Sequence, residues 1–195
     1  MMKIEDCRAR LEELEKAREE LLKISRELRI LASKAIVAIH EGNLELAEER
    51  ISKGKEILSR LNEFQRFPEI FYSLSFESMQ EFAEAVFFEK AVKEDFDFTL
   101  DFEISHSAFI TGLADAIGEL RRFALSKMIE NDLEKAEEIL EVMERIYSEL
   151  LSFVSFPEKL IPNLRQKLDV ARAGIERTKS DLITAKLYAS LDRNR

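Results

Sequence analysis

Four acidic residues on two apolar segments are the feature of this chain best suited to chemistry. Glu81 and Glu84 lie three residues apart in the run 81–86, and Asp115 and Glu119 lie four apart in the run 112–120. Residues three or four apart in an α-helix project from the same face. Carboxylates on largely apolar faces need a counter-charge, because burying an unpaired charge is costly. A divalent metal ion is one candidate for that counter-charge.

Hard oxygen ligands of this kind suit Mg²⁺, with Mn²⁺ as an alternative ion. Such an ion neutralises charge at a phosphate and makes its bound water more acidic, which are the needs of phosphodiester hydrolysis. In this interpretation Glu81, Glu84 and Asp115 bind the metal or activate water. Glu119 is a further ligand or base. The spacing does not divide these roles among the four acids.

A structural role is the alternative for the same acids. The chain has 39 Asp and Glu among its 195 residues, and acids at helical spacing commonly form solvated faces or salt bridges. Glu119 could pair with Arg122 on the next helical turn. Glu81 could pair with Lys90 or Arg121. Such pairs would leave the acids without a catalytic role.

Two groups of basic residues are candidates for binding phosphate groups. Arg121 and Arg122 directly follow the second acidic pair, and Arg26, Arg29 and Lys34 lie along the first predicted helix. Phosphate contacts of Lys and Arg weaken as salt rises, which makes this role testable. Pairing with local acids, or a solvated or subunit-facing surface, explains both groups equally well.

The composition indicates an all-α fold. The chain is 46% hydrophobic and 35% charged, with 5 Gly, 3 Pro and no Trp. We expect a single domain over residues 1–195, a bundle of about six to seven long helices joined by short turns. The predicted helices span about residues 5–41, 44–64, 68–92, 107–130, 131–153 and 162–189.

Local signals mark several helix ends. Gly42 is expected to end the first helix and Asn43 to cap the second. Pro68 suits the first turn of the third helix. Asn131, with Glu134 three residues later, predicts a capping box for the fifth.

Three other features carry structural predictions. Residues 96–104 alternate apolar and polar side chains, and we expect an extended connection whose phenylalanines are held in a groove between helices. A two-stranded ribbon between subunits is the less favoured alternative.

Gly112 and Gly118 flank Asp115 and should let a neighbouring helix approach, bringing the acidic pairs together. The run Leu28–Ile39 is apolar nearly all round, which favours burial between subunits.

Several classes of protein are disfavoured. The net charge of −9 is not that of a basic nucleic-acid-binding domain, although local fields matter more than the total. Cys7 is the single cysteine, and His40 and His106 show no metal-ligand spacing. The chain has no apolar run of about 18 residues and no apolar signal region at its beginning. We therefore expect a soluble, cytoplasmic protein without a membrane span.

Four motifs resemble the translin superfamily, and within it Trax rather than translin. They are Phe67-Pro68 opening a helix, the acidic runs 81–86 and 112–120, and the run 164–169 opening the last helix. Translin itself lacks acids at the first pair and at the position of Asp115, whereas Trax-type chains have them. The short 93–106 connection resembles that of archaeal members.

The resemblance implies a seven-helix fold that assembles into a hollow, barrel-shaped octamer, built in archaeal relatives from one chain type. It implies a metal-dependent endoribonuclease with its site on the inner wall, where the acids equivalent to Glu81, Glu84, Asp115 and Glu119 form the catalytic, metal-binding set. In animals, Trax pairs with translin to remove the nicked passenger strand of small-RNA duplexes. The alternative is a non-catalytic protein of the translin type, which binds single-stranded nucleic acid or acts as a scaffold. A plain helical dimerisation module would explain the apolar first helix but not the acidic pairs.

Overall fold

The computed structural model describes residues 3–192, and these form six α-helices and two short 3₁₀ turns without a strand. The all-α prediction is therefore confirmed. The helices are α1 (Ile4–His40), α2 (Leu44–Asn62), α3 (Pro68–Val92), α4 (His106–Ile129), α5 (Leu133–Leu150) and α6 (Leu164–Asp192), with 3₁₀ turns at Glu63–Arg66 and Leu151–Phe153.

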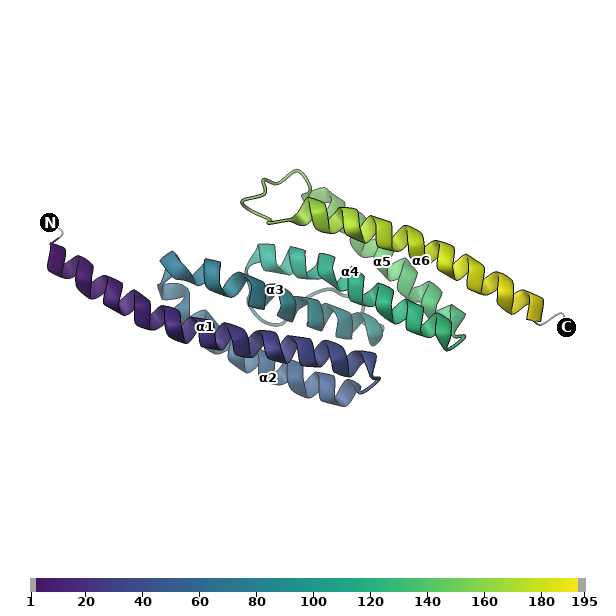
Figure 1. Ribbon diagram of the computed structural model, residues 1–195, viewed down its shortest axis with the longest axis horizontal. Helices are drawn as coiled ribbons and strands as arrows, with labels where there is room; N and C mark the ends of the chain where they lie inside the picture. The colour runs from purple at the N-terminus through teal and green to yellow at the C-terminus, as the bar shows by residue number, and fades with distance from the viewer. Residues whose placement is uncertain (1–2, 193–195) are drawn as a thin grey trace.

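The helices lie side by side in an elongated bundle (Figure 1). α1 packs on α2 and α3, α3 packs on α4, and α4 packs on α5 and α6. The beginning of α1 and the end of α6 project beyond the other helices at opposite ends of the long axis. The central helices α3 and α4 are the two that carry the acidic pairs.

α3 is held on two sides because it is apolar on most of its surface. Phe82 packs in one buried cluster with side chains of α1 and α2, such as Leu28 and Leu58. Phe87 and Phe88 pack in a second cluster, formed mainly with α4, α5 and α6. Each fully buried Phe contributes roughly 1.5–3 kcal/mol relative to exposure. This burial fixes the rotation of α3, and thereby the directions of its acids.

Gly112 allows α3 and α4 to approach closely. A Cβ atom at Gly112 would lie 2.7 Å from the Gln80 carbonyl oxygen and 2.8 Å from the Ala83 Cβ. The prediction for Gly112 is confirmed, but that for Gly118 is wrong, because no heavy atom lies within 4 Å of its Cβ position. Six residues rotate a helix by about 240°, so the two glycines face different directions.

The turn after α1 has the predicted chemistry. Gly42 has a φ of 76°, Gly42 N donates to Ile39 O at 3.0 Å, and Asn43 N donates to Ala38 O at 2.9 Å. This is a Schellman motif, which favours glycine at the left-handed position. The Asn43 side chain then accepts a hydrogen bond from Leu46 N and caps α2.

The capping box predicted for α5 is wrong. Asp132, not Asn131, is the N-cap, and its side chain accepts a hydrogen bond from Lys135 N at 3.1 Å. Asn131 instead ends α4 with a φ of 63°, a conformation that asparagine tolerates better than most residues.

The connection between α3 and α4 contains neither helix nor strand, and its phenylalanines pack against α3 as predicted. The ring of Phe102 lies 5.3 Å from that of Phe82, and the ring of Phe98 lies 6.1 Å from that of Phe87. These contacts fix the connection to both buried clusters.

The apolar run 28–39 is only partly covered within one chain. Leu28, Ala32 and Ala35 are buried, whereas Ile30 and Val37 are 47% and 49% exposed. None of the described helices is long and apolar enough to cross a membrane.

Candidate functional site

The acidic pairs are brought together where α3 crosses α4. Glu84, Asp115 and Glu119 line a groove of about 670 Å³ between α4 and α6. Glu81, one turn before Glu84, lies in a second groove of about 770 Å³ between α1 and α3. The structure therefore gathers three of the four predicted acids in one groove and places Glu81 beside it.

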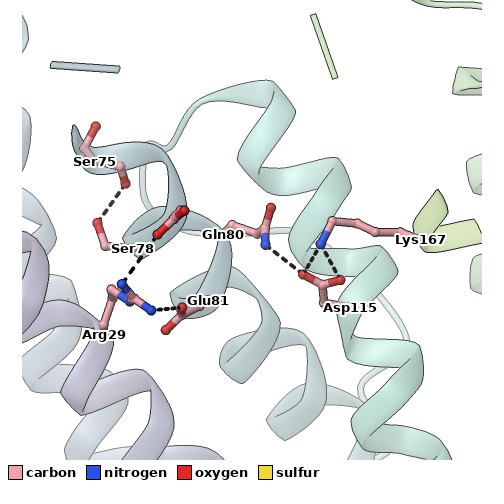
Figure 2. A network of polar contacts seen from close by, with 8 residues as sticks. Arg29, Ser75, Ser78, Gln80, Glu81, Asp115 and Lys167 are labelled. Atoms are coloured by element: carbon pink, nitrogen blue, oxygen red, sulfur yellow. Dashed lines mark hydrogen bonds and ion pairs between the residues drawn. The ribbon is translucent and has the colours of Figure 1, made fainter. Parts of the chain in front are cut away.

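Asp115 is held by two partners from different helices (Figure 2). The Lys167 ammonium lies 2.7 Å from both carboxylate oxygens, and Gln80 Nε2 donates to Oδ2 at 2.8 Å. Burial nevertheless raises the pKa of Asp115, because the loss of solvation outweighs the opposing effect of Lys167.

Glu81 is turned toward α1. Its Oε1 lies 2.8 Å from Arg29 Nη2, and the same guanidinium lies 3.5 Å from Glu77 (Figure 2). The pairings considered from the sequence are wrong: Lys90 pairs with Asp95 at 2.7 Å.

The other alternative partner of Glu81, Arg121, instead lies 3.8 Å from Asp181 on α6. Packing between helices, rather than proximity along the chain, therefore decides the partner of each charge.

Glu119 contacts two basic side chains. Its Oε2 lies 2.5 Å from His40 Nε2 and 3.8 Å from Arg122 Nη1, so the predicted pairing with Arg122 is confirmed. His40 is the last residue of α1, and its ring packs 4.8 Å from that of Phe88.

Glu84 differs from the other three acids, since within residues 3–192 it has no hydrogen bond or ion pair. Burial, followed by the negative charges of Asp115, Glu119 and Glu81, raises the pKa of Glu84 to about 8. The positive charge of Lys167 offsets only part of this effect. The cluster thus contains a carboxyl group that lacks a counter-charge.

The chemistry of these carboxyl groups suits a hard divalent cation. Three carboxyl groups line one groove, one of them, Glu84, is unpaired, and their oxygen donors are of the type that Mg²⁺ and Mn²⁺ prefer. In the described part of the chain no three His, Cys, Asp or Glu side chains are close enough to share an ion. Lys167 and His40 hold the flanking carboxylates, so chelation requires side-chain rearrangement around Glu84.

The predicted RNA-binding residues divide between the two grooves. Arg121 lines the groove between α4 and α6, and its Nε is buried without a hydrogen-bond partner in the described residues. Arg122 is exposed beside Glu119. The remaining three, all on α1, line the groove between α1 and α3: Arg26, Arg29 and Lys34.

The sequence reasoning missed three residues that hold the acids. Lys167 belongs to the run 164–169 that carries part of the family resemblance, so the resemblance could have marked it as a site residue. Gln80 directly precedes the first acidic run, but its amide offers no distinctive pattern. His40 lies 79 positions from Glu119, so only the packing of α1 could reveal their contact.

Comparison with known proteins gives consistent matches over most of the chain. A model of the Translin family matches residues 16–180. The uncharacterized protein MJ0175 of Methanocaldococcus jannaschii is 34% identical over 173 residues, covering 86% of this chain and 75% of the relative. The crystal structure of AfC3PO and the structure of an AfC3PO–duplex RNA complex are each 52% identical, with a TM-score of 0.94 and coverage of 96% of this chain and 98% of theirs. The crystal structure of apo-NeC3PO shares the fold at 20% identity, with a TM-score of 0.81 and coverage of 95% and 98%.

Proposed function

We propose that this chain, which belongs to the translin family, is a metal-dependent endoribonuclease that cleaves RNA inside a hollow homo-oligomer. One observation carries the proposal: Glu84, an acid without a counter-charge, lies beside Asp115 and Glu119 in an open groove. Such an arrangement reduces stability, and strongly perturbed ionisable groups in a groove are typical of sites that bind or react.

RNA is the substrate that both the relatives and the groove support. AfC3PO, a relative at 52% identity, has been solved with duplex RNA. In this chain Arg121, Lys167 and Arg177 line the same groove as the acids. Their positive charges are suited to the phosphates of a nucleic-acid backbone.

The residues of the site have the properties that phosphodiester hydrolysis requires. Glu84, Asp115 and Glu119 would hold Mg²⁺ or Mn²⁺, with Glu81 as a further ligand. A bound ion supplies charge neutralisation at the phosphate and a more acidic water.

An ionised carboxylate of the cluster would take a proton from the water that attacks phosphorus, while the phosphorus–oxygen bond to the ribose breaks and the departing ribose oxygen takes a proton from solvent. His40 Nε2, 2.5 Å from Glu119 Oε2, orients this carboxyl group. Arg121 stabilises negative charge on the phosphate oxygens.

Assembly is supported by apolar side chains that one chain leaves uncovered. On α1 these include Ile30 and Val37, and on α6 they include Ile183, Leu187 and Leu191, each about half or more exposed. We propose a homo-octamer, in which these faces are buried between copies. Light scattering should give a mass several times that of the 22.7 kDa chain, and a monomeric mass at micromolar concentration would contradict the assembly.

A non-catalytic nucleic-acid-binding role is the second candidate. It is favoured by the contacts of Lys167 and Arg29, which already neutralise Asp115 and Glu81 without a metal ion. In that case the acids would be structural partners of basic side chains. RNA would be bound but not cleaved.

A cleavage assay separates the two candidates. End-labelled single-stranded and duplex RNA are incubated with the protein in Mg²⁺, in Mn²⁺ and in chelator. We expect cleavage only with a divalent ion, and a loss of at least about a hundredfold in Glu84→Gln. Glu77→Gln, a change of an exposed acid on the same helix, serves as the control.

RNA binding without cleavage under all of these conditions would support the second candidate. Full activity of Glu84→Gln would show that the site has been assigned to the wrong residues.

A further inference from the structure

The connection that precedes α6 positions Lys167 beside the acids. Asn163, with a φ of 59°, donates its backbone N–H to Glu158 Oε1 at 2.7 Å, and its carbonyl accepts from Lys167 N at 3.0 Å. These contacts fix the first turn of α6. The Lys167 side chain then crosses to α4, and in the described chain it is the lysine that contacts one of the four acids.

The ammonium of Lys167 contacts both carboxylate oxygens of Asp115. Nζ lies 2.7 Å from Oδ1 and from Oδ2, while Gln80 holds Oδ2 from the other side. Both oxygens of Asp115 are therefore engaged within the chain. A second cation can reach this carboxylate only if the ammonium moves, because like charges at contact distance repel strongly.

The groove gives the ammonium a place to move to. The Lys167 side chain is 20% exposed, and the groove beside it is open at Gly118, where no heavy atom lies within 4 Å of the Cβ position. Arg121 and Arg177 line the same groove. A phosphate entering there would meet three positive charges. Of the three side chains, that of Lys167 can move most readily, because lysine carries its charge on a flexible stem.

We propose that Lys167 is a catalytic residue with two successive partners: its ammonium is the internal counter-ion of Asp115 in the resting protein, and it moves to a phosphate oxygen of the RNA when a divalent ion binds Asp115. The inference rests on the proposed function and adds a residue to its site. It explains why a basic side chain neutralises one of the acids that metal binding requires.

Competition for Asp115 is tested by titrating Mn²⁺ into the RNA-free protein and following the heat of binding. In Lys167→Met the dissociation constant should fall about tenfold, because the competing charge is gone. Lys179→Met, which removes a lysine of the same helix paired with Glu144, should bind Mn²⁺ as the unaltered protein does. Unchanged or weaker Mn²⁺ binding in Lys167→Met would overturn the inference.

Cleavage by the same variants provides the second measurement. At saturating Mn²⁺, the single-turnover rate of Lys167→Met should fall at least about a hundredfold, as expected when a cation that stabilises phosphate charge is removed. Tighter ion binding together with slower cleavage distinguishes this role from a structural one, because damage to the fold would weaken both. Lys167→Gln, which keeps a hydrogen-bond donor toward Asp115, replaces the Met variant if circular dichroism shows that the latter is unfolded.

The controls separate this inference from the proposed function. If the unaltered protein neither binds Mn²⁺ nor cleaves RNA, both are wrong. If the unaltered protein is active and the Lys167 variants cleave at its rate, only the role of Lys167 is wrong.

Discussion

Replacing Glu84 with Gln should stabilise the metal-free protein at alkaline pH. Gln has nearly the shape of the protonated acid but cannot ionise, so the variant avoids placing a negative charge among Asp115, Glu119 and Glu81. Most substitutions of part-buried residues are destabilising. A gain in stability here would therefore directly report the unfavourable charge at this position.

The size and sign of the effect follow from the pKa of Glu84. This pKa is about 8 in the folded protein, against an ordinary value of 4.5, which corresponds to an ionisation penalty of roughly 5 kcal/mol as an upper limit. Below pH 4.5 both the folded and the unfolded chain hold the proton, and there is no penalty. Between the two pKa values the folded state keeps a proton that the unfolded chain releases, so the free energy of unfolding falls as the pH rises. Above pH 8 the penalty is complete.

Urea denaturation in chelator, at a fixed protein concentration, measures this difference. We expect the variant to gain about 2–5 kcal/mol over the unaltered protein near pH 8.5, and the gain to vanish near pH 4.5. Divalent ions should stabilise the unaltered protein at alkaline pH and have little effect on Glu84→Gln. The control Glu77→Gln should stay within about 0.5 kcal/mol throughout, since that carboxylate is 75% exposed. Parallel stability curves for Glu84→Gln and the unaltered protein would refute the reasoning, because they would mean that Glu84 is solvated or paired in solution.

Three further predictions concern neighbouring residues. Asp115→Asn should destabilise the metal-free protein by about 1–3 kcal/mol in thermal or urea unfolding, because it leaves Lys167 unpaired; the partial exposure of this pair keeps the loss below that of a fully buried one. Gly112→Ala should cost about 1–3 kcal/mol by the same measurement, whereas Gly118→Ala should gain up to about 1 kcal/mol, and equal effects would contradict the close packing at Gly112 alone. Arg121→Glu should weaken RNA binding and reduce the slope of log affinity against log salt by about one or more, and an unchanged slope would remove this residue from the phosphate contacts.

The features that the sequence predicted correctly are those that depend on neighbours along the chain. Helical spacing placed Glu81 and Glu84 on adjacent turns, and the Gly42-Asn43 pair marked the turn after α1. The alternation in residues 96–104 correctly predicted a non-helical segment held by its phenylalanines. Each of these patterns reflects backbone geometry or the burial of one local face.

The contacts that the sequence did not reveal are those between helices. Asp115 and Lys167 are 52 positions apart, and Glu119 and His40 are 79 apart. A local search for charge partners correctly found Arg122, one turn from Glu119, but it could not find the basic residues contributed by α1 and α6. Nor could it tell which glycine faces α3, since that depends on how α4 is rotated in the bundle.

The contact with Lys167 changes how the stability of Asp115 variants should be interpreted. A metal ligand crowded by other acids is expected to be replaceable at little cost, and a structural salt bridge is expected to be costly to break. Both roles would use the same carboxylate, because a metal ion bound to Asp115 would replace the Lys167 ammonium as its cationic partner. A destabilised Asp115→Asn is therefore compatible with catalysis, and only activity and ion binding can decide its role.

Glu84 is the one of the four acids that has no basic partner in the described chain. Arg29 neutralises Glu81, Lys167 neutralises Asp115, and Arg122 lies beside Glu119. Stability alone would favour a neutral or apolar side chain at position 84, since the carboxyl group there has no partner in the described chain and its ionisation is opposed by burial and by three acids. With a pKa of about 8, this carboxyl group is mostly protonated at neutral pH, and a bound cation would favour its ionisation. The groove between α4 and α6 is lined by both acids and basic residues, a combination suited to an ion and to the phosphate that would accompany it.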